Sequence, residues 1–125
     1  MFKDTKAFSA FAVDDLDAAR TFYGDTLGIE TSDDMGLLTL HLAAGARPTL
    51  VYPKPDFEPA TYTILNFPVD DIDAAVDELI ERGVDFELYE GFGQDDRGVA
   101  RGEGAPPIAW FRDPAGNILA VLETG

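Results

Sequence analysis

Two segments of the chain carry apolar residues at the three- and four-residue spacing of an amphipathic helix. The apolar positions are Leu16, Ala19, Tyr23 and Leu27 in the first segment, and Ile72, Ala75, Val76, Leu79 and Ile80 in the second. An Asp pair precedes each run, and a short carboxylate at that place caps the free N–H groups of a helix start. The pattern therefore predicts one helix from Asp14 or Asp15 to Gly28 and another over 71–82.

Short apolar runs around these helices predict strands. The predicted strands of the first half cover 7–13, 29–32, 37–42 and 49–52, and those of the second half cover 62–69, 84–89, 108–112 and 118–123. A turn is expected over 33–36. The segment Asp113-Pro114-Ala115-Gly116-Asn117 predicts a hairpin, because Pro follows its first residue and Gly-Asn tolerates positive φ. The order strand–helix–strand–strand–strand thus occurs twice.

The two halves also repeat each other in sequence. The heptad Val13-Asp14-Asp15-Leu16-Asp17-Ala18-Ala19 returns, with Ile in place of Leu, as the heptad that begins at Val69. A repeat of this length is too small to bury its own apolar face. We therefore expect a single domain over 1–125, in which a first module (1–52), a proline-rich connector (53–61) and a second module (62–125) enclose a shared cleft.

Composition narrows the classes of function. The chain contains no Cys, which excludes disulfides, thiolate chemistry and Cys-ligated metals. Its formal net charge of −15 disfavours nucleic acid and weakly favours a cationic ligand through long-range attraction. No apolar run approaches the roughly 20 residues that cross a bilayer, and no export signal is apparent. We expect a cytoplasmic protein that binds neither nucleic acid nor a membrane.

Three segments resemble the vicinal oxygen chelate superfamily, which includes glyoxalase I, bleomycin-resistance proteins, fosfomycin-resistance proteins and extradiol dioxygenases. They are the opening strand and helix from Phe8 to Leu27-Gly28, the second opening from Ile64 to Ala75, and the terminal Phe-x-Asp-Pro-x-Gly-Asn hairpin. The resemblance implies an α+β fold of two βαβββ modules that form a cupped mixed sheet, the glyoxalase/bleomycin resistance/dihydroxybiphenyl dioxygenase fold. It also implies a homodimer.

Metal-using members of that superfamily take His, Glu or Gln ligands from the first and last strands of each module. Carried over one at a time, these positions fall on Phe8, Ile64 and Ala120, and near Thr49. The first three side chains cannot donate a lone pair and Thr is a poor neutral ligand, whereas such a site needs about three protein ligands. We therefore expect no metal, no cofactor and no catalytic residue, but an apolar cavity that holds an organic molecule.

The expected ligand is a hydrophobic or planar small molecule. The residues expected to line its site are Phe8, Ala10, His41, Tyr52, Ile64, Asn66, Tyr89, Phe92, Trp110 and Ala120. Trp110 offers a flat surface and one donor, with core packing as the alternative. Asn66 orients a ligand if its side of the strand faces the cleft, and otherwise caps a backbone edge. His41 is the only imidazole, and a structural role is favoured for it.

The segment 90–107 contains five glycines and two prolines. It is either a functional loop that closes the site or a disordered surface insertion. Arg97, Arg101 and Arg112 lie in or near it and offer partners for a ligand carboxylate, but ordinary ion pairing is favoured in a chain with 24 acids. For the paired aspartates, helix capping is favoured over acid–base catalysis.

Three functions remain open. The leading interpretation is a metal-independent small-molecule binding protein of the glyoxalase/bleomycin resistance type, which sequesters an antibiotic or a metabolite. The second is a metal-dependent lyase, isomerase or dioxygenase with a displaced metal site built from His41 and carboxylates such as Glu90 or Glu123. The third is a protein-interaction module without a ligand. We favour a binding protein over an enzyme.

Overall fold

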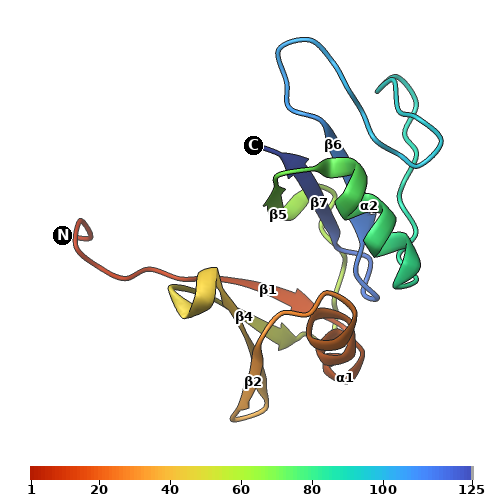
Figure 1. Ribbon diagram of the computed structural model, residues 1–125. Coiled ribbons are helices and arrows are strands. Elements are labelled where there is room, and N and C mark those ends of the chain that lie inside the picture. The colour runs from red at the N-terminus through yellow and green to blue at the C-terminus, as the bar shows by residue number, and fades with distance from the viewer. Residues whose placement is uncertain (125) are drawn as a thin grey trace. The chain divides into compact units, whose positions relative to one another are not determined.

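The computed structural model describes residues 1–124 and is an α+β fold with two mixed sheets (Figure 1). The chain forms two compact units, Met1–Glu58 and Pro59–Gly125. Within the described residues, each unit has one sheet with a helical segment after its first strand. No helix in this part of the chain is long and apolar enough to span a bilayer.

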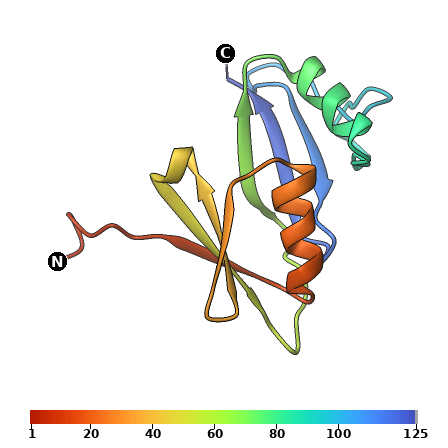
Figure 2. The same cartoon turned by 60° about the horizontal axis from the view of Figure 1, so that its bottom comes forward.

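The first unit contains a four-stranded sheet in the order β1-β4-β3-β2 (Figure 2). Its elements are β1 (Ser9–Val13), α1 (Leu16–Arg20), the π-helix η1 (Thr21–Thr26), β2 (Thr31–Asp34), β3 (Leu37–Leu42), the 3-10 turn η2 (Ala43–Gly45) and β4 (Arg47–Pro53). β1 runs parallel to β4, and the other pairs are antiparallel. The core lies between α1–η1 and one face of the sheet, where Tyr23, Leu38 and Val51 are fully buried.

The second unit contains a three-stranded sheet in the order β5-β7-β6. Its elements are β5 (Thr63–Val69), α2 (Ile72–Glu81), β6 (Ile108–Arg112) and β7 (Ile118–Glu123). β5 runs parallel to β7, and β6 runs antiparallel to β7. One sheet face packs against α2, where Val76, Leu119 and Val121 form the core. The pairing thus repeats that of β1, β4 and β3 in the first unit, without a counterpart of β2 among the described residues.

The capping prediction is confirmed in both repeats. The side chain of Asp15 accepts a hydrogen bond from the backbone N–H of Ala18 at 3.2 Å, and Asp71 accepts one from Ala74 at 3.1 Å. Both caps are the second Asp of their pair, in extended conformation. These carboxylates satisfy free N–H groups of the first helical turn, so capping accounts for their place in the repeat.

Several expected elements differ from the structure. The first predicted helix is α-helical only over Leu16–Arg20 and continues as a π-helix, in which the Leu27 N–H reaches the Phe22 carbonyl. The turn expected over 33–36 is confined to Met35-Gly36, because Asp33 and Asp34 pair within β2. The strand predicted over 84–89 is wrong: only an isolated bridge joins Phe86 to Phe111.

Candidate ligand-binding site

Three of the expected site residues lie side by side in the second unit. Asn66 on β5 and Trp110 on β6 are both register partners of Ala120 on β7. Because directly paired residues present their side chains on the same sheet face, these three form one row across the strands. Their neighbours along each strand face α2, so the row lies on the face away from that helix. Ile64 lies beside a register irregularity of β5 and is half-buried.

At the Trp110 end of this row, three aromatic rings contact one another; we call Tyr89, Phe92 and Trp110 the aromatic cluster. The ring centroids of Tyr89 and Trp110 are 5.6 Å apart, those of Phe92 and Trp110 5.4 Å, and those of Tyr89 and Phe92 5.8 Å. These distances are typical of edge-to-face and tilted aromatic pairs. The structure thus places in mutual contact three of the residues that were expected to line the ligand site.

Gln94 holds the backbone that carries Tyr89. Its side-chain Oε1 accepts a hydrogen bond from the Tyr89 N–H at 2.6 Å, and its Nε2 donates to the carbonyl oxygens of Glu87 and Gly98, both at 2.8 Å. The three bonds fix Tyr89 beside Trp110 without a continuous strand ladder. Sequence reasoning missed Gln94, because a lone Gln in a glycine-rich segment gives no pattern that distinguishes it.

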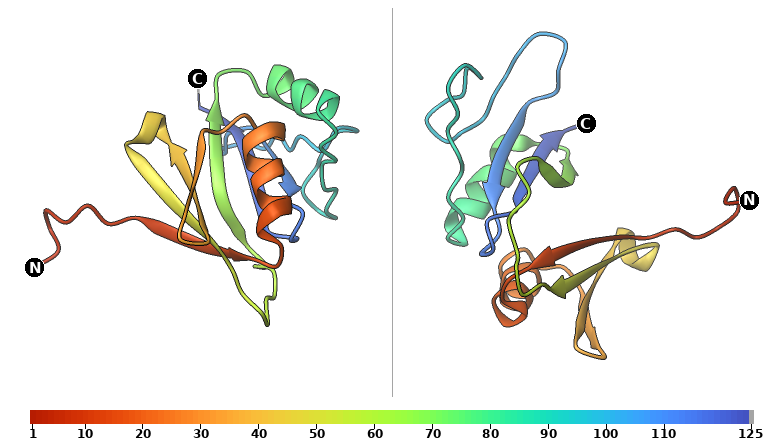
Figure 3. Two further views of the ribbon diagram at one scale, coloured as in Figure 1. Left: turned by 90° about the horizontal axis from the view of Figure 1, so that it is seen from below. Right: turned by 180° about the vertical axis from the view of Figure 1, so that it is seen from behind.

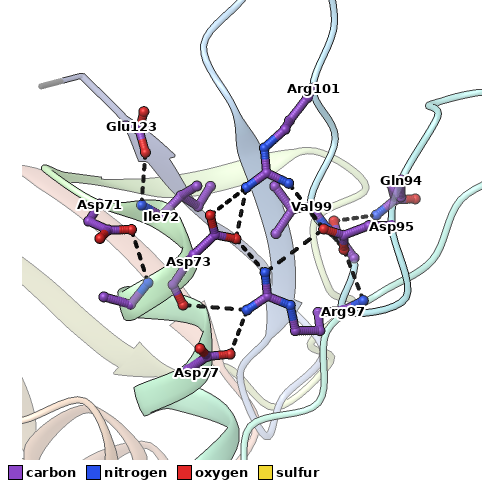
Figure 4. A network of polar contacts seen from close by, with 12 residues as sticks. Asp71, Ile72, Asp73, Asp77, Gln94, Asp95, Arg97, Val99, Arg101 and Glu123 are labelled. Carbon is purple, nitrogen blue, oxygen red and sulfur yellow. Dashed lines mark hydrogen bonds and ion pairs between the residues drawn. The ribbon is translucent and has the colours of Figure 1, made fainter.

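The aromatic cluster depends on a loop that ion pairs attach to α2 (Figure 4). The loop network consists of Asp73 and Asp77 on α2 with Asp95, Arg97 and Arg101 on the loop. Arg101 donates to both carboxylate oxygens of Asp73 at 2.8 Å, and Arg97 bonds both helix aspartates. Hydrogen bonds from Arg101 and Arg97 lower the pKa of Asp73.

Further contacts join segment 90–107 to the second unit, whereas its expected role in closing the site stays a prediction. Val99 and Ala100 are buried within it, and Ala100 forms backbone bonds with Ile108 in both directions. The loop approaches α2 in both views of Figure 3. The stretch 94–101 is therefore packed and bonded within the second unit. Arg97 and Arg101 form ordinary ion pairs, as does Arg112 with Glu87.

In the first unit, the expected site residues also share one sheet face. Ala10, Tyr52 and His41 occupy alternate positions to the buried Leu38 and Val51, so they lie on the face away from α1. Phe8 precedes β1 and is largely exposed. The His41 Nε2 lies 2.7 Å from the Ser32 hydroxyl, a partner that the sequence did not indicate. The cleft expected between the two modules stays a prediction.

The positions that the resemblance assigns to metal ligands do not fit a metal ion. Phe8, Ile64 and Ala120 carry no donor atoms, and Ala120 is fully buried. Thr49 is buried on the α1 side of the first sheet, where its hydroxyl lies 3.0 Å from that of Ser9. The neighbouring residue on the other face is Leu50, which is also apolar. The chemistry of these side chains therefore does not support a metal centre there.

The displaced metal site is not assembled either. Glu123 accepts a hydrogen bond from the backbone N–H of Ile72 at 3.0 Å, so it serves the start of α2. His41 is bonded to Ser32, and Glu90 is exposed in the loop. Over residues 1–124, no three His, Asp or Glu side chains are grouped so that they could share a metal ion.

Comparison with known proteins identifies the family of this chain and solved structures with the same fold. Residues 7–121 match the family described as the Glyoxalase/Bleomycin resistance protein/Dioxygenase superfamily. No curated protein matches the chain.

Solved structures with the same fold include TnmS3, described as an antibiotic binding protein from Streptomyces sp. CB03234 (TM-score 0.68, 21% identity, 95% of this chain and 96% of that chain covered). A putative glyoxalase family protein from Bacillus anthracis is similar over 100% of both chains (TM-score 0.71, 21% identity). UcmS2 is similar over 92% of this chain and 94% of its own (TM-score 0.71, 20% identity). At these identities the likeness shows the fold alone.

Proposed function

This chain belongs to the Glyoxalase/Bleomycin resistance protein/Dioxygenase superfamily, and from that premise we propose that it binds a planar organic small molecule without a metal. The family description spans enzymes and resistance proteins, so the family itself does not choose between catalysis and binding. The observation that carries the proposal is the aromatic cluster beside the row of Asn66, Ala120 and Trp110.

This arrangement suits a flat apolar ligand. Trp110 supplies a large rigid surface, and an aromatic pair contributes about 0.5–1.5 kcal/mol beyond the burial of its area. Ala120 lies between Asn66 and Trp110 in the row, where its buried methyl group adds a small apolar contact. The exposed amide of Asn66 offers two donors and an acceptor that can orient polar atoms at the ligand's edge.

The apolar side chains at three of the four family positions, Phe8, Ile64 and Ala120, support the same proposal. Where metal-using members place electron donors, these three side chains consist of hydrocarbon alone, which favours contact with an organic molecule over coordination of a metal ion. One structural neighbour, TnmS3, is described as an antibiotic binding protein. We therefore propose sequestration of an antibiotic or metabolite as the role of this chain, with steering of cationic compounds by its net charge of −15.

Thermal unfolding with a set of two- and three-ring aromatic compounds tests the proposal. A compound present at ten times its dissociation constant should raise the unfolding temperature by roughly 5 °C, because binding to the folded state alone stabilises that state. The rise should persist in EDTA. Trp110→Phe, with its smaller ring, should reduce the rise, whereas Phe2→Ala, which removes an exposed ring of the N-terminal segment, should leave it unchanged.

Two results would contradict the proposal. One is that no compound of the set raises the unfolding temperature. The other is that the rise disappears in EDTA and returns with zinc, nickel, iron or manganese, which would favour the metal-dependent alternative.

A further inference from the structure

The hydroxyl of Tyr89 is a buried polar group without a hydrogen-bond partner among the described residues. Such groups are rare in folded proteins, because a buried donor or acceptor left unpaired costs about 1–3 kcal/mol. This hydroxyl lies on the ring that contacts Trp110 and Phe92, inside the site proposed for the ligand. The orphaned atom therefore points to a polar group that is supplied from outside the chain.

Phe92 is the part of the aromatic cluster that is best placed to move. It remains 55% exposed while its ring contacts both Trp110 and Tyr89. It stands between Gly91 and Gly93, whose φ angles of 85° and 62° lie in the region that glycine adopts without strain. A short segment with glycine on both sides can change its path at low cost.

The residues on either side of this segment are fixed. Tyr89 is bound through its N–H to Gln94, and Gln94 is bound in turn to Glu87 and Gly98. The loop network then attaches the following residues to α2. Movement is thus confined to 90–93, so Phe92 can leave Trp110 while Tyr89 stays in place.

We propose that Phe92 covers the Tyr89 hydroxyl, and that a planar aromatic ligand displaces the Phe92 ring, stacks on Trp110 and forms a hydrogen bond with Tyr89 Oη. This inference rests on the proposed function and specifies its ligand as an aromatic molecule with a ring-bound hydroxyl or carbonyl. The ligand ring replaces the Phe92 ring on Trp110, so stacking alone gives little net gain. The hydrogen bond to Tyr89 Oη, which Phe92 cannot form, therefore distinguishes this ligand from aromatic molecules without a polar group.

A matched pair of probes tests this inference. 2-Naphthol and 2-methylnaphthalene have the same ring system and differ in one group, a hydroxyl or a methyl. Their dissociation constants are measured through the fluorescence of Trp110, the single tryptophan of the chain, with wild type, Tyr89→Phe and Tyr62→Phe. Tyr62 is exposed, so Tyr62→Phe is a control for the loss of a hydroxyl elsewhere.

The preference for 2-naphthol over 2-methylnaphthalene, taken as the ratio of their dissociation constants, should be about fivefold greater in wild type and in Tyr62→Phe than in Tyr89→Phe. This factor corresponds to one ordinary hydrogen bond. Because both probes are compared in every protein, the difference in their own hydrophobicity cancels. Phe92→Ala should bind both probes more tightly by a similar factor, since neither probe then has to displace a ring.

The results separate this inference from the proposed function. If the probes bind but their ratio is the same in wild type and Tyr89→Phe, the selecting role of Tyr89 is wrong and the aromatic binding site stands. If Phe92→Ala weakens both probes, Phe92 is a wall of the site and the inference of a cover is wrong. If neither probe binds and no compound of the thermal set does, the proposed function itself fails.

Discussion

At the scale of single residues, the Tyr89 hydroxyl is expected to lower the stability of the ligand-free chain. Its hydroxyl is buried without a partner in the described structure, while its ring packs against two other aromatic rings. If position 89 served packing alone, Phe would fill it at least as well as Tyr, because Phe has the same ring without the unpaired hydroxyl. Groups that bind a ligand often destabilise the ligand-free fold, because their polar atoms are paired only when the ligand is present.

We expect Tyr89→Phe to raise the free energy of unfolding by about 1 kcal/mol, because it removes the unpaired hydroxyl and keeps the ring. Urea unfolding of the ligand-free protein measures this change. Tyr62→Phe, at an exposed position, should leave the unfolding free energy unchanged. A loss of stability in Tyr89→Phe would show that the hydroxyl has a partner in the fold.

Some single residues were predictable and others were not. The capping aspartates follow from local chemistry, since a carboxylate just before a helix has few other roles, and Asp15 and Asp71 perform the expected one. Gln94 and Ser32 act through partners brought close by turns of the chain. Polar residues of this kind leave no periodic signal, so their roles emerge only in the folded structure.

At the scale of elements, the loop between α2 and β6 depends on charged side chains. Each ion pair of the loop network is partly exposed, and an isolated pair of this kind contributes little. The pairs of this network are coupled rather than isolated, because Asp73 accepts hydrogen bonds from both Arg97 and Arg101. Because its ion pairs lower the pKa of Asp73, the carboxylate stays charged below the ordinary range for Asp, and the stabilisation is lost as the pH falls from that range through the lowered pKa.

We expect Asp73→Asn to release the loop, because the loss of charge weakens its bonds to both arginines. Trypsin should then cleave after Arg97 and Arg101 several-fold faster than in wild type, as followed by mass spectrometry. Asp17→Asn is the matched control, since Asp17 occupies the same position in the first repeat and its partner Arg20 keeps Asp33. Equal cleavage rates in wild type and Asp73→Asn would contradict a holding role for the network.

The sequence predicted most elements, because their apolar residues follow the period of a helix or a strand. The helix α2 and the strands β6 and β7 lie where the pattern placed them. The prediction of a strand over 84–89 was wrong because apolar residues alone do not ensure pairing with a neighbouring strand. Here a single bridge forms at Phe86, and the Tyr89 N–H then donates to the Gln94 side chain. The π-helical part of the first helix could not be predicted, because the spacing of its apolar residues does not distinguish a π-helix from an α-helix.

At the scale of the whole molecule, the internal repeat and the family resemblance predicted the α+β fold with its two similar sheets. They could not predict the ligand. The fold accommodates many activities, and the residues of the proposed site are mostly apolar or aromatic side chains, which the sequence alone does not distinguish from core. The aromatic cluster became visible because the loop brings Tyr89 and Phe92 to Trp110.

The central claim is that this chain binds a planar organic molecule through the face of Asn66, Ala120 and Trp110, without a metal. An NMR titration of the nitrogen-15-labelled protein with 2-naphthol in EDTA tests it most directly. The account predicts saturable shifts at the Trp110 indole N–H and the Asn66 side-chain amide, with the amides of α2, on the opposite face of the same sheet, unmoved. Absence of saturation at Trp110, or shifts that occur only after a divalent transition metal is added, would contradict it.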